Sequence, residues 1–567
     1  MTKAVLSTLE LLAFLLPGAA LLGAYMARVF RGDRTFLSPV LAPIEHGVYR
    51  LCAIDERREM SARTYALCVI ATTLVGCLVL FLLQVLQGFL PLNPQGLRGV
   101  RWDTALNTAI SFGTNTNWQS YAGETTMTAL TQMLGLAVQN FLSAAVGLAV
   151  AVATIRGFVR REAHGIGNFW VDLTRAIVHV LLPLALVLAV VLVSQGVVQT
   201  LRSPVHAQTV EGAKQVLPVG PVASQEAIKE LGTNGGGYYN ANSAHPFENP
   251  NGLTNLLENV SMLLIPAGLV FAFGILVGNR RQGRALLLAM LALFLLGAGV
   301  SLWAESSGSA RLADAGVAGG VNFEGKETRV GVAGSALWSE STTATSTGAV
   351  DSAHDSDMPL AGLVQLLNMG LGEVVFGGVG VGLIGMLFYV ILAMFVAGLM
   401  IGRTPEFLGK KLGAREMTMA VIGVLAPSVL LLAGTAIALV LPAGLRGLAN
   451  PSAHGLSEAL YAYTSAAANN GSAMAGLVAN TPFYNLTLGF VMLVGRFATL
   501  LPGLAIGAAL ARKRAVPANT AAFPTTGLLF VGVLVGVILL VGALTYFPAF
   551  SLGPILEHLG LGAGRAL

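Results

Sequence analysis

Ten long apolar stretches constrain the fold of this chain more than any other feature of its sequence. A helix that crosses a bilayer needs about 20 predominantly apolar residues. Stretches of this kind lie at 6–27, 65–87, 126–155, 172–199, 254–278, 284–303, 379–401, 417–441, 484–511 and 525–548. Only 11% of the 567 residues are charged, against about 25% in soluble domains. The sequence therefore predicts an all-α polytopic membrane protein with ten transmembrane helices in the lipid bilayer.

The basic residues are distributed unevenly between the connections. Of the 33 lysines and arginines, 21 lie in the alternate connections at 27–63, 155–175, 279–284, 402–416 and 511–514. Cytoplasmic loops carry such an excess, so we expect these connections in the cytoplasm and both termini on the extracytoplasmic side. The net charge of +5 is then a signal of topology, and we expect no nucleic-acid partner.

Shorter, semi-polar segments lie between some of the spans, at 102–112, 223–231, 357–370 and 456–467. They are too short and too polar to cross a bilayer, so we expect re-entrant helices. The connection at 304–357 is rich in Ser, Gly, Ala and Thr and has eight acidic residues against three basic ones. We expect it to be a mobile or loosely folded external lobe.

Each of these four segments precedes a stretch rich in Gly and Asn and then a returning span, which predicts four repeats around one pore. The predicted filter residues are Thr114, Asn115, Thr116, Asn117 and Gln119; Gly232, Thr233, Asn234, Gly235 and Gly236; Gly377, Gly378, Val379 and Gly380; and Asn469, Asn470, Gly471 and Ser472. Glycine and asparagine tolerate positive φ, so successive carbonyls can face one axis. A ring of such carbonyls binds a dehydrated monovalent cation. Close helix packing is the alternative reading of a single such stretch.

The repeats divide the chain. The predicted units are a first span with a cytoplasmic loop (1–61), repeat 1 (62–160), repeat 2 (161–279), repeat 3 (280–412, with the external insertion 304–357), repeat 4 (413–514), and a last span with an external C-terminus (515–567).

Several polar or flexible positions at membrane depth need an explanation. Glu373 and Arg496 are predicted to pair beside the filter; capping of backbone amides by Glu373 and snorkelling of Arg496 form the alternative. Gln119 either offers an oxygen at the outer mouth or makes loop hydrogen bonds. Glycines in the span 379–401 and just beyond it predict a broken or bent helix that gates the pore, with tight packing as the alternative. The gate candidates are Gly385, Gly398 and Gly402.

Four stretches carry a resemblance to a known family: Thr114-Asn-Thr-Asn-Trp-Gln, Leu231-Gly-Thr-Asn-Gly-Gly-Gly-Tyr-Tyr-Asn-Ala-Asn, Gly377-Gly-Val-Gly-Val-Gly and Ala467-Ala-Asn-Asn-Gly-Ser-Ala. They resemble those of the KdpA family, the potassium-binding subunits of a bacterial ATP-driven uptake complex. The resemblance implies the fold of the potassium-transporter superfamily, K⁺ as the transported ion and a place in the bacterial inner membrane. It also implies three partners, a P-type ATPase subunit (KdpB), a single-span subunit (KdpC) and a small hydrophobic subunit (KdpF), with lateral exit of the ion toward KdpB.

Motifs for ATP hydrolysis are missing from the sequence. It has neither a GxxxxGK[ST] loop nor an Asp-Lys-Thr-Gly stretch. We therefore assign no catalytic residues and no organic cofactor, and expect a non-catalytic subunit. A stand-alone channel or symporter with the same pore is the first alternative. A redox subunit is the second, although the sequence shows no intramembrane His pairs, Cys ligands or acidic dyads that would support it.

Overall fold

A computed structural model describes residues 2–202, 204–308, 316, 321–402, 405–450, 452–514 and 523–562. Within these residues, ten helical segments are long and apolar enough to cross a membrane, as the sequence predicts. They are α1 (Thr2–Arg31), α3 (Ala62–Leu86), α6 (Val138–Val159) with the π-helical segment η2 (Thr131–Ala137), α7 (Phe169–Arg175) continued by the π-helical segment η3 (Ala176–Leu181) and α8 (Leu182–Ser194), α10 (Gly252–Leu276), α11 (Arg280–Ser307), α15 (Val381–Ile401), α16 (Ala414–Val440), α19 (Pro482–Ala511) and α20 (Leu528–Leu552).

Shorter elements connect the spans. They are α2 (Ser38–Leu51), η1 (Gln87–Phe89), α4 (Trp102–Gly113), α5 (Gly123–Thr126), β1 (Val205–Gln208), β2 (Lys214–Leu217), α9 (Val222–Leu231), η4 (Asn242–Ala244), α13 (Gly331–Ala344), η5 (His354–Ser356), α14 (Pro359–Gly370), β3 (Glu406–Phe407), β4 (Lys410–Lys411), α17 (Pro442–Leu445), α18 (Ser452–Ala468) and α21 (Pro554–Gly562). The strands form two antiparallel pairs, β1–β2 and β3–β4.

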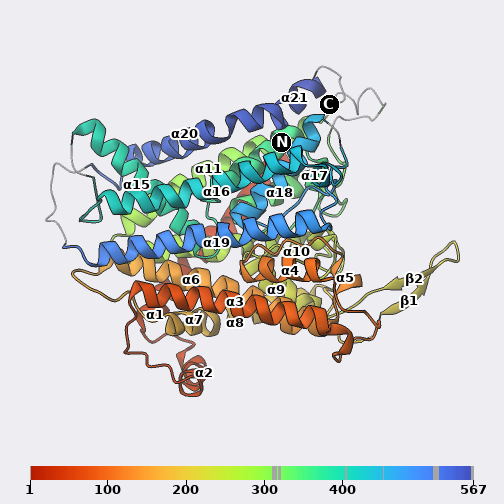
Figure 1. Ribbon diagram of the computed structural model, residues 1–567, viewed down its shortest axis with the longest axis horizontal. Helices are drawn as coiled ribbons and strands as arrows, with labels where there is room; N and C mark the ends of the chain where they lie inside the picture. Colours follow the sequence, from red (N-terminus) through yellow and green to blue (C-terminus); the bar gives the residue numbers. More distant parts are fainter. Residues whose placement is uncertain are drawn as a thin grey trace.

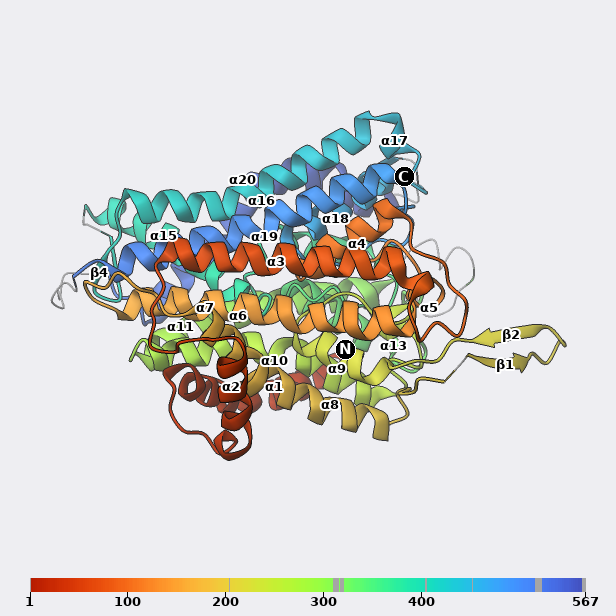
Figure 2. The same cartoon turned by 60° about the horizontal axis from the view of Figure 1, so that its bottom comes forward.

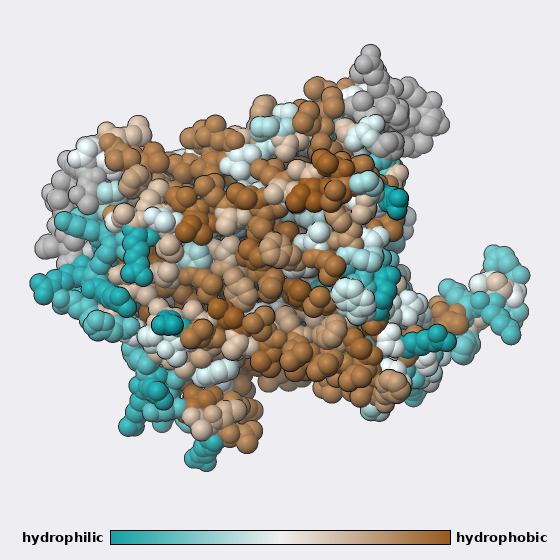
Figure 3. Space-filling view, viewed as in Figure 1, coloured by the Kyte–Doolittle hydropathy of each residue, from teal (hydrophilic) through white to brown (hydrophobic). Residues whose placement is uncertain are grey.

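The spans run roughly parallel to the long axis of the molecule (Figures 1 and 2). Hairpin β1–β2 and helices α17 and α21 lie toward one end, which we call the hairpin end, and α2 lies toward the other, the α2 end. Apolar side chains cover the middle of the visible face, while hydrophilic ones gather at the two ends (Figure 3). This pattern fits a surface that faces lipid in the middle and water at both ends.

Four spans form the centre of the fold. Helices α6, α10, α15 and α19 contact one another in that circular order. The span that precedes each of them packs against a short helix of its own repeat: α3 on α4, α8 on α9, α11 on α13 and α16 on α18. The structure thus has the predicted repeat of span, short helix and returning span.

The short helix of repeat 3 does not lie at 357–370, where the sequence predicts it. Helix α13 occupies the position expected for 357–370, and it lies inside the connection 304–357 that was expected to be a loose lobe; that expectation is wrong for α13. Every residue from Ser335 to Ala344 is buried. The hydroxyls of Ser339, Ser341 and Thr343 donate to carbonyls of the preceding turn, so a helix rich in Ser and Thr is buried without unpaired hydroxyls at these positions.

The backbones of α6 and α19 meet at glycines. A β-carbon on Gly157 of α6 would lie 2.1 Å from the carbonyl oxygen of Gly507 on α19. Any larger residue at this crossing would have to push the two helices apart.

A buried charge cluster holds α9 in place. The Lys229 ammonium, fully buried, lies 2.7 Å from Glu226, 3.4 Å from Glu230 and 3.1 Å from Glu248. Glu258 of α10 is also fully buried beside Glu226 and Glu230. The single ammonium therefore offsets part of a concentrated negative charge, at the end of α9 that leads into the Gly232–Gly237 stretch.

Replacing Lys229 by methionine is expected to destabilise the protein severely. The change leaves three buried carboxylates without their counter-charge, and loss of one partner from a buried pair costs about 3–5 kcal/mol. Thermal unfolding of the purified protein in detergent measures the loss. The matched control is Lys214→Met on the exposed strand β2, and equal unfolding temperatures for the two variants would contradict the role of the cluster.

Candidate functional site

Helices α4, α9, α13 and α18 end in the same backbone geometry. The N–H groups of Thr116, Asn234, Thr347 and Asn470 each donate to the carbonyl five residues earlier, at 2.9, 2.8, 3.2 and 2.9 Å. The residue before each of them has positive φ (65°, 50°, 57° and 62°). This is a common C-terminal cap of helices, and it turns the chain sharply at equivalent places. We name the segments at these turns filter strand 1 (residues 114–117), filter strand 2 (232–236), filter strand 3 (345–348) and filter strand 4 (469–472).

The four filter strands converge on one point. A β-carbon on Gly235 would lie 2.9, 3.0 and 3.1 Å from the carbonyl oxygens of Thr347, Thr116 and Asn470. Main-chain oxygens from strands 1, 3 and 4 therefore surround the α-carbon of Gly235 in strand 2. Glycine is needed at this position because any side chain would enter that ring of oxygens.

Side-chain hydrogen bonds join the filter strands in the order 2, 1, 4 and 3. The Asn115 amide donates to the Thr233 carbonyl at 2.8 Å, and Asn234 donates to Asn115 at 2.8 Å, which joins strands 1 and 2. The Ser346 hydroxyl donates to the Asn469 carbonyl at 2.9 Å, and the Asn469 amide donates to the Thr116 hydroxyl at 2.9 Å. The side-chain amides thus connect strands, which leaves backbone carbonyls as the groups around the shared point.

The structure places the predicted residues of strands 1, 2 and 4 around one point. Gln119 makes a reciprocal pair with Gly237, donating to its carbonyl at 3.1 Å and accepting from its N–H at 3.0 Å. This geometry favours the loop-bonding alternative for Gln119. Gly236 packs against the Phe112 ring and the Asn117 carbonyl of strand 1.

The structure corrects the prediction for the third filter strand. Residues 345–348 occupy the third position, and Gly377–Gly380 lie on a different segment, loop 371–380, beside the filter. There the Val379 N–H donates to the Thr233 hydroxyl at 3.0 Å, and a β-carbon on Gly378 would lie 3.0 Å from that of Ser346. A β-carbon on Gly380 would meet the Gly147 carbonyl of α6. These glycines allow a close approach to strands 2 and 3 and to α6 without contributing to the converging carbonyls.

The signal for strand 3 is present in the sequence. Strand 3 reads Thr345-Ser346-Thr347 and strand 1 reads Thr114-Asn115-Thr116. In both, the two threonine hydroxyls lie in hydrogen-bonding distance, at 2.7 Å in strand 3 and 2.8 Å in strand 1.

Glu373 and Arg496 line one small cavity but make separate contacts. A Glu373 oxygen accepts from the Asn470 amide at 2.7 Å, and Arg496 donates to the Ser143 carbonyl at 2.9 Å. No ion pair within 4.0 Å joins these two described residues. The cavity, about 30 Å³, has room for about one water molecule. The two side chains face each other across this cavity. The structure does not show the predicted direct pair between Glu373 and Arg496.

The predicted break in the third returning span lies upstream of the gate candidates. Helix α15 is continuous from Val381 to Ile401 through Gly385 and Gly398, and Gly402 ends it in a left-handed conformation. The continuous helix contradicts a break at these glycines, while a bend that gates the pore stays a prediction. The interruption is loop 371–380, between α14 and α15, where Glu373 and Phe376 have positive φ.

A cavity of about 500 Å³ opens above the filter at the hairpin end. Its lining includes one residue or more from every strand: Asn117, Gly235, Gly348 and Gly471. The converging carbonyls are therefore reached from this end through an open vestibule.

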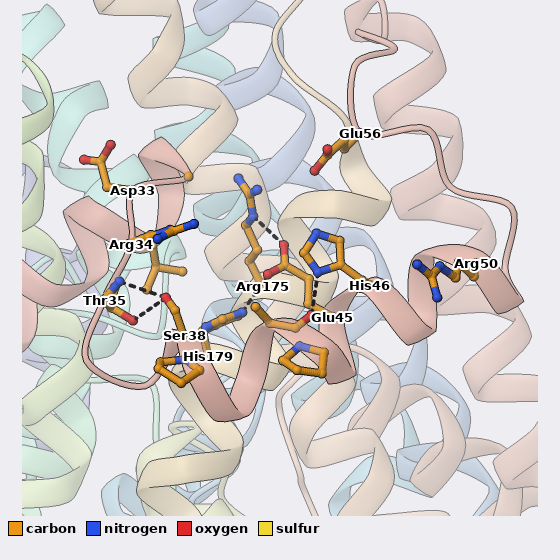
Figure 4. A pocket seen from close by; sticks show the side chains of 15 residues that line it. Asp33, Arg34, Thr35, Ser38, Glu45, His46, Arg50, Glu56, Arg175 and His179 are labelled. Atoms are coloured by element: carbon orange, nitrogen blue, oxygen red, sulfur yellow. Dashed lines mark hydrogen bonds and ion pairs between the residues drawn. The ribbon is translucent and has the colours of Figure 1, made fainter.

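A second large cavity, about 900 Å³, lies far from the filter at the α2 end (Figure 4). Glu45 of α2 accepts hydrogen bonds from Arg175 at 2.9 Å and from Tyr49 at 2.6 Å, and lies 2.8 Å from His179 Nε2. Burial raises the pKa of Glu45, but these hydrogen bonds outweigh it and bring the pKa to about 2. The Glu45 carboxylate thus holds α2 against Arg175 and His179. We interpret these polar residues of the cavity as structural.

Comparisons with known proteins agree with this architecture. The sequence model of the KdpA family, described as potassium-transporting ATPase A subunit, matches residues 9–559. A protein of Methylobacterium nodulans named "Potassium-transporting ATPase potassium-binding subunit" is 58% identical over 96% of this chain and 95% of its own length. A protein of Rhodospirillum centenum with the same name is 56% identical over 99% and 97%.

The fold has a counterpart among solved structures. The potassium transporter TrkH of Vibrio parahaemolyticus superposes with a TM-score of 0.53 at 15% identity, covering 88% of this chain and 97% of that one. At this identity the likeness concerns the fold alone. The family match, which extends over nearly the whole sequence, decides the classification: the chain belongs to the KdpA family of potassium-transporting ATPase A subunits.

Proposed function

We propose that this chain binds K⁺ from the hairpin side in the four-strand filter and passes it to an ATP-hydrolysing partner subunit. The observation that carries the proposal is the convergence of the Thr116, Thr347 and Asn470 carbonyls on Gly235 below an open vestibule. The names of relatives 58% and 56% identical to this chain, which call them potassium-binding subunits of an ATPase, support the choice of ion and of energy source.

The chemistry of the filter suits a weakly hydrated monovalent cation. Main-chain carbonyls replace the hydration shell of such an ion without adding a fixed charge that would hold it too tightly. Helices α4, α9, α13 and α18 also end at the filter, and the C-terminal end of a helix dipole is negative. Because the asparagine side chains are committed to joining strands, the ring of carbonyls is fixed before the ion arrives.

The route beyond the filter leads sideways in this proposal. Loop 371–380 contacts strands 2, 3 and 4 through Val379, Gly378 and Glu373 and obstructs a straight path toward the α2 end. The partners are then KdpB, the P-type ATPase subunit that receives the ion, with KdpC and KdpF completing the complex.

The proposed location is the bacterial inner membrane, with the hairpin end outside. The connections at the α2 end carry the excess of lysine and arginine that is typical of cytoplasmic loops. The start of α1 and helix α21 lie toward the hairpin end in Figure 1, so this proposal places both termini outside.

A stand-alone channel or symporter is the second candidate, favoured by the TrkH-like fold. Co-purification distinguishes the two functions. A P-type ATPase subunit that accompanies this chain through two affinity steps supports the pump, whereas K⁺ flux through the chain alone in liposomes supports the channel.

Gly235→Ala tests the filter directly. Its β-carbon would stand about 3 Å from three carbonyl oxygens, so we expect K⁺ affinity to fall at least about tenfold, equivalent to about 1.4 kcal/mol. The measurement is K⁺-dependent ATPase activity of the assembled complex. Gly252→Ala, where a β-carbon meets nothing within 4 Å, is the control. An unchanged K⁺ dependence in Gly235→Ala would contradict the proposed site.

Glu373 is expected to act by positioning strand 4 through Asn470. Glu373→Ala removes the acceptor at 2.7 Å, and a hydrogen bond to a charged group contributes about 1.5–3 kcal/mol. We therefore expect weaker K⁺ binding in Glu373→Ala and a smaller loss in Glu373→Gln, which keeps an acceptor oxygen. Isothermal titration with K⁺ compares the two variants. Equal losses would instead indicate that the charge facing Arg496 is what matters.

A further inference from the structure

A second cluster of ligating side chains lies outside the filter, where η5, α18 and α21 meet at the hairpin end. It consists of Asp355 on η5, His454 and Glu458 on α18, and Glu557 on α21. The side chains of Asp355 and His454 are 20% and 22% exposed, so solutes reach the cluster. The proposed transport function uses none of these residues.

The imidazole of His454 is oriented by one carboxylate and directed at another. Its Nδ1 lies 2.7 Å from Glu557 Oε2, and its Nε2 lies 3.2 Å from Asp355 Oδ1. A ligating oxygen of Glu458 completes a group whose three atoms all lie within 4.8 Å of one another. Ligand atoms bound at about 2.0–2.1 Å to a tetrahedral zinc ion lie about 3.3 Å apart, close to the spacing between His454 and Asp355.

Glu458 supplies an independent sign of a missing ligand. The residue is 1% exposed. Its Oε1 accepts from Asn450 at 2.7 Å, but its Oε2 has no hydrogen-bond partner among the residues that the structure describes. A buried carboxylate oxygen without a partner is costly, and a cation at the centre of the cluster would satisfy it.

We propose that Asp355, His454 and Glu458 bind a divalent transition-metal ion of the Zn²⁺ type, with water in the remaining position. Imidazole together with carboxylates is a ligand set that such ions accept. Glu557 holds Nδ1–H of the ring and so presents Nε2 to the metal, which is the usual arrangement around a metal-bound histidine. Gly476 packs closely against these carboxylates: a β-carbon there would lie 2.2 Å from Glu458 Oε1 and 3.1 Å from Asp355 Oδ2, so a larger residue would displace them.

The site is linked to filter strand 4. His354, next to Asp355, lies 2.8 Å from the Tyr461 hydroxyl, which in turn lies 2.8 Å from the Ser472 hydroxyl. Ser472 also bonds to Asn470 through its N–H at 3.0 Å. A bound metal ion would therefore fix the loop before α14, the pore helix α18 and the C-terminal helix α21 relative to one another and to the filter.

Metal content of the purified complex tests the proposal. Complex without a polyhistidine tag is stripped with EDTA, dialysed against Zn²⁺ and analysed by mass spectrometry for bound zinc. We expect one zinc per chain in the native protein and a zinc-dependent rise in the unfolding temperature. Both are expected to disappear in His454→Ala and in Glu458→Gln. Glu557→Ala, which loses only the orienting carboxylate, is expected to bind about 10–100-fold more weakly.

His558→Ala is the matched control, because His558 neighbours Glu557 on α21 but is not among the grouped ligands. Co²⁺ substitution adds a spectroscopic readout, since a tetrahedral site gives visible absorption that His454→Ala removes. Absence of stoichiometric zinc in the native complex would overturn the proposal and leave His454 as a proton-carrying bridge between two carboxylates. Equal zinc content in His454→Ala and His558→Ala would overturn it as well.

Discussion

The structure depends on hydrogen bonds that run from side chains of one filter strand to the next. Asn115 reaches the Thr233 carbonyl, Ser346 reaches the Asn469 carbonyl, and Asn469 reaches the Thr116 hydroxyl. Each strand is too short and too irregular to hold itself by backbone bonds, and at membrane depth irregular backbone persists only where it is buried in protein or lines a cavity. Together with the backbone caps at the ends of the four short helices, these bonds fix the direction of the carbonyls that converge on Gly235.

The environment of the filter is asymmetric although its four strands are similar. Strand 2 leads from the Lys229 cluster into Gly237, whose N–H and carbonyl are both held by Gln119. In strand 4, the Asn470 amide donates a hydrogen bond to Glu373. In repeat 3, loop 371–380 separates the short helix α14 from the returning span α15. The filter strands therefore have different surroundings, and the proposed sideways route would use that difference.

Much of this arrangement could be predicted from the sequence, because it follows from local patterns. Long apolar runs predict the ten spans, and stretches of Gly and Asn after short semi-polar helices predict strands 1, 2 and 4. Repeat 3 was misassigned for two physical reasons. Helix α13 is rich in Ser, Thr, Gly and Ala, so it resembles a loop in composition, and the hydroxyls of Ser339 and Thr343 bond to carbonyls of the same helix. The glycines at 377–380 then offered a stronger but misleading signal. The joining of strands by amide side chains depends on rotamers and long-range packing, which no local pattern specifies.

The contact between Gly157 of α6 and Gly507 of α19 has a mechanical meaning. Two helices whose backbones touch without intervening side chains cannot slide past each other without a steric clash, so we expect repeats 1 and 4 to move together. Loop 371–380, which separates α14 from α15, is where we expect movement within this subunit to be concentrated.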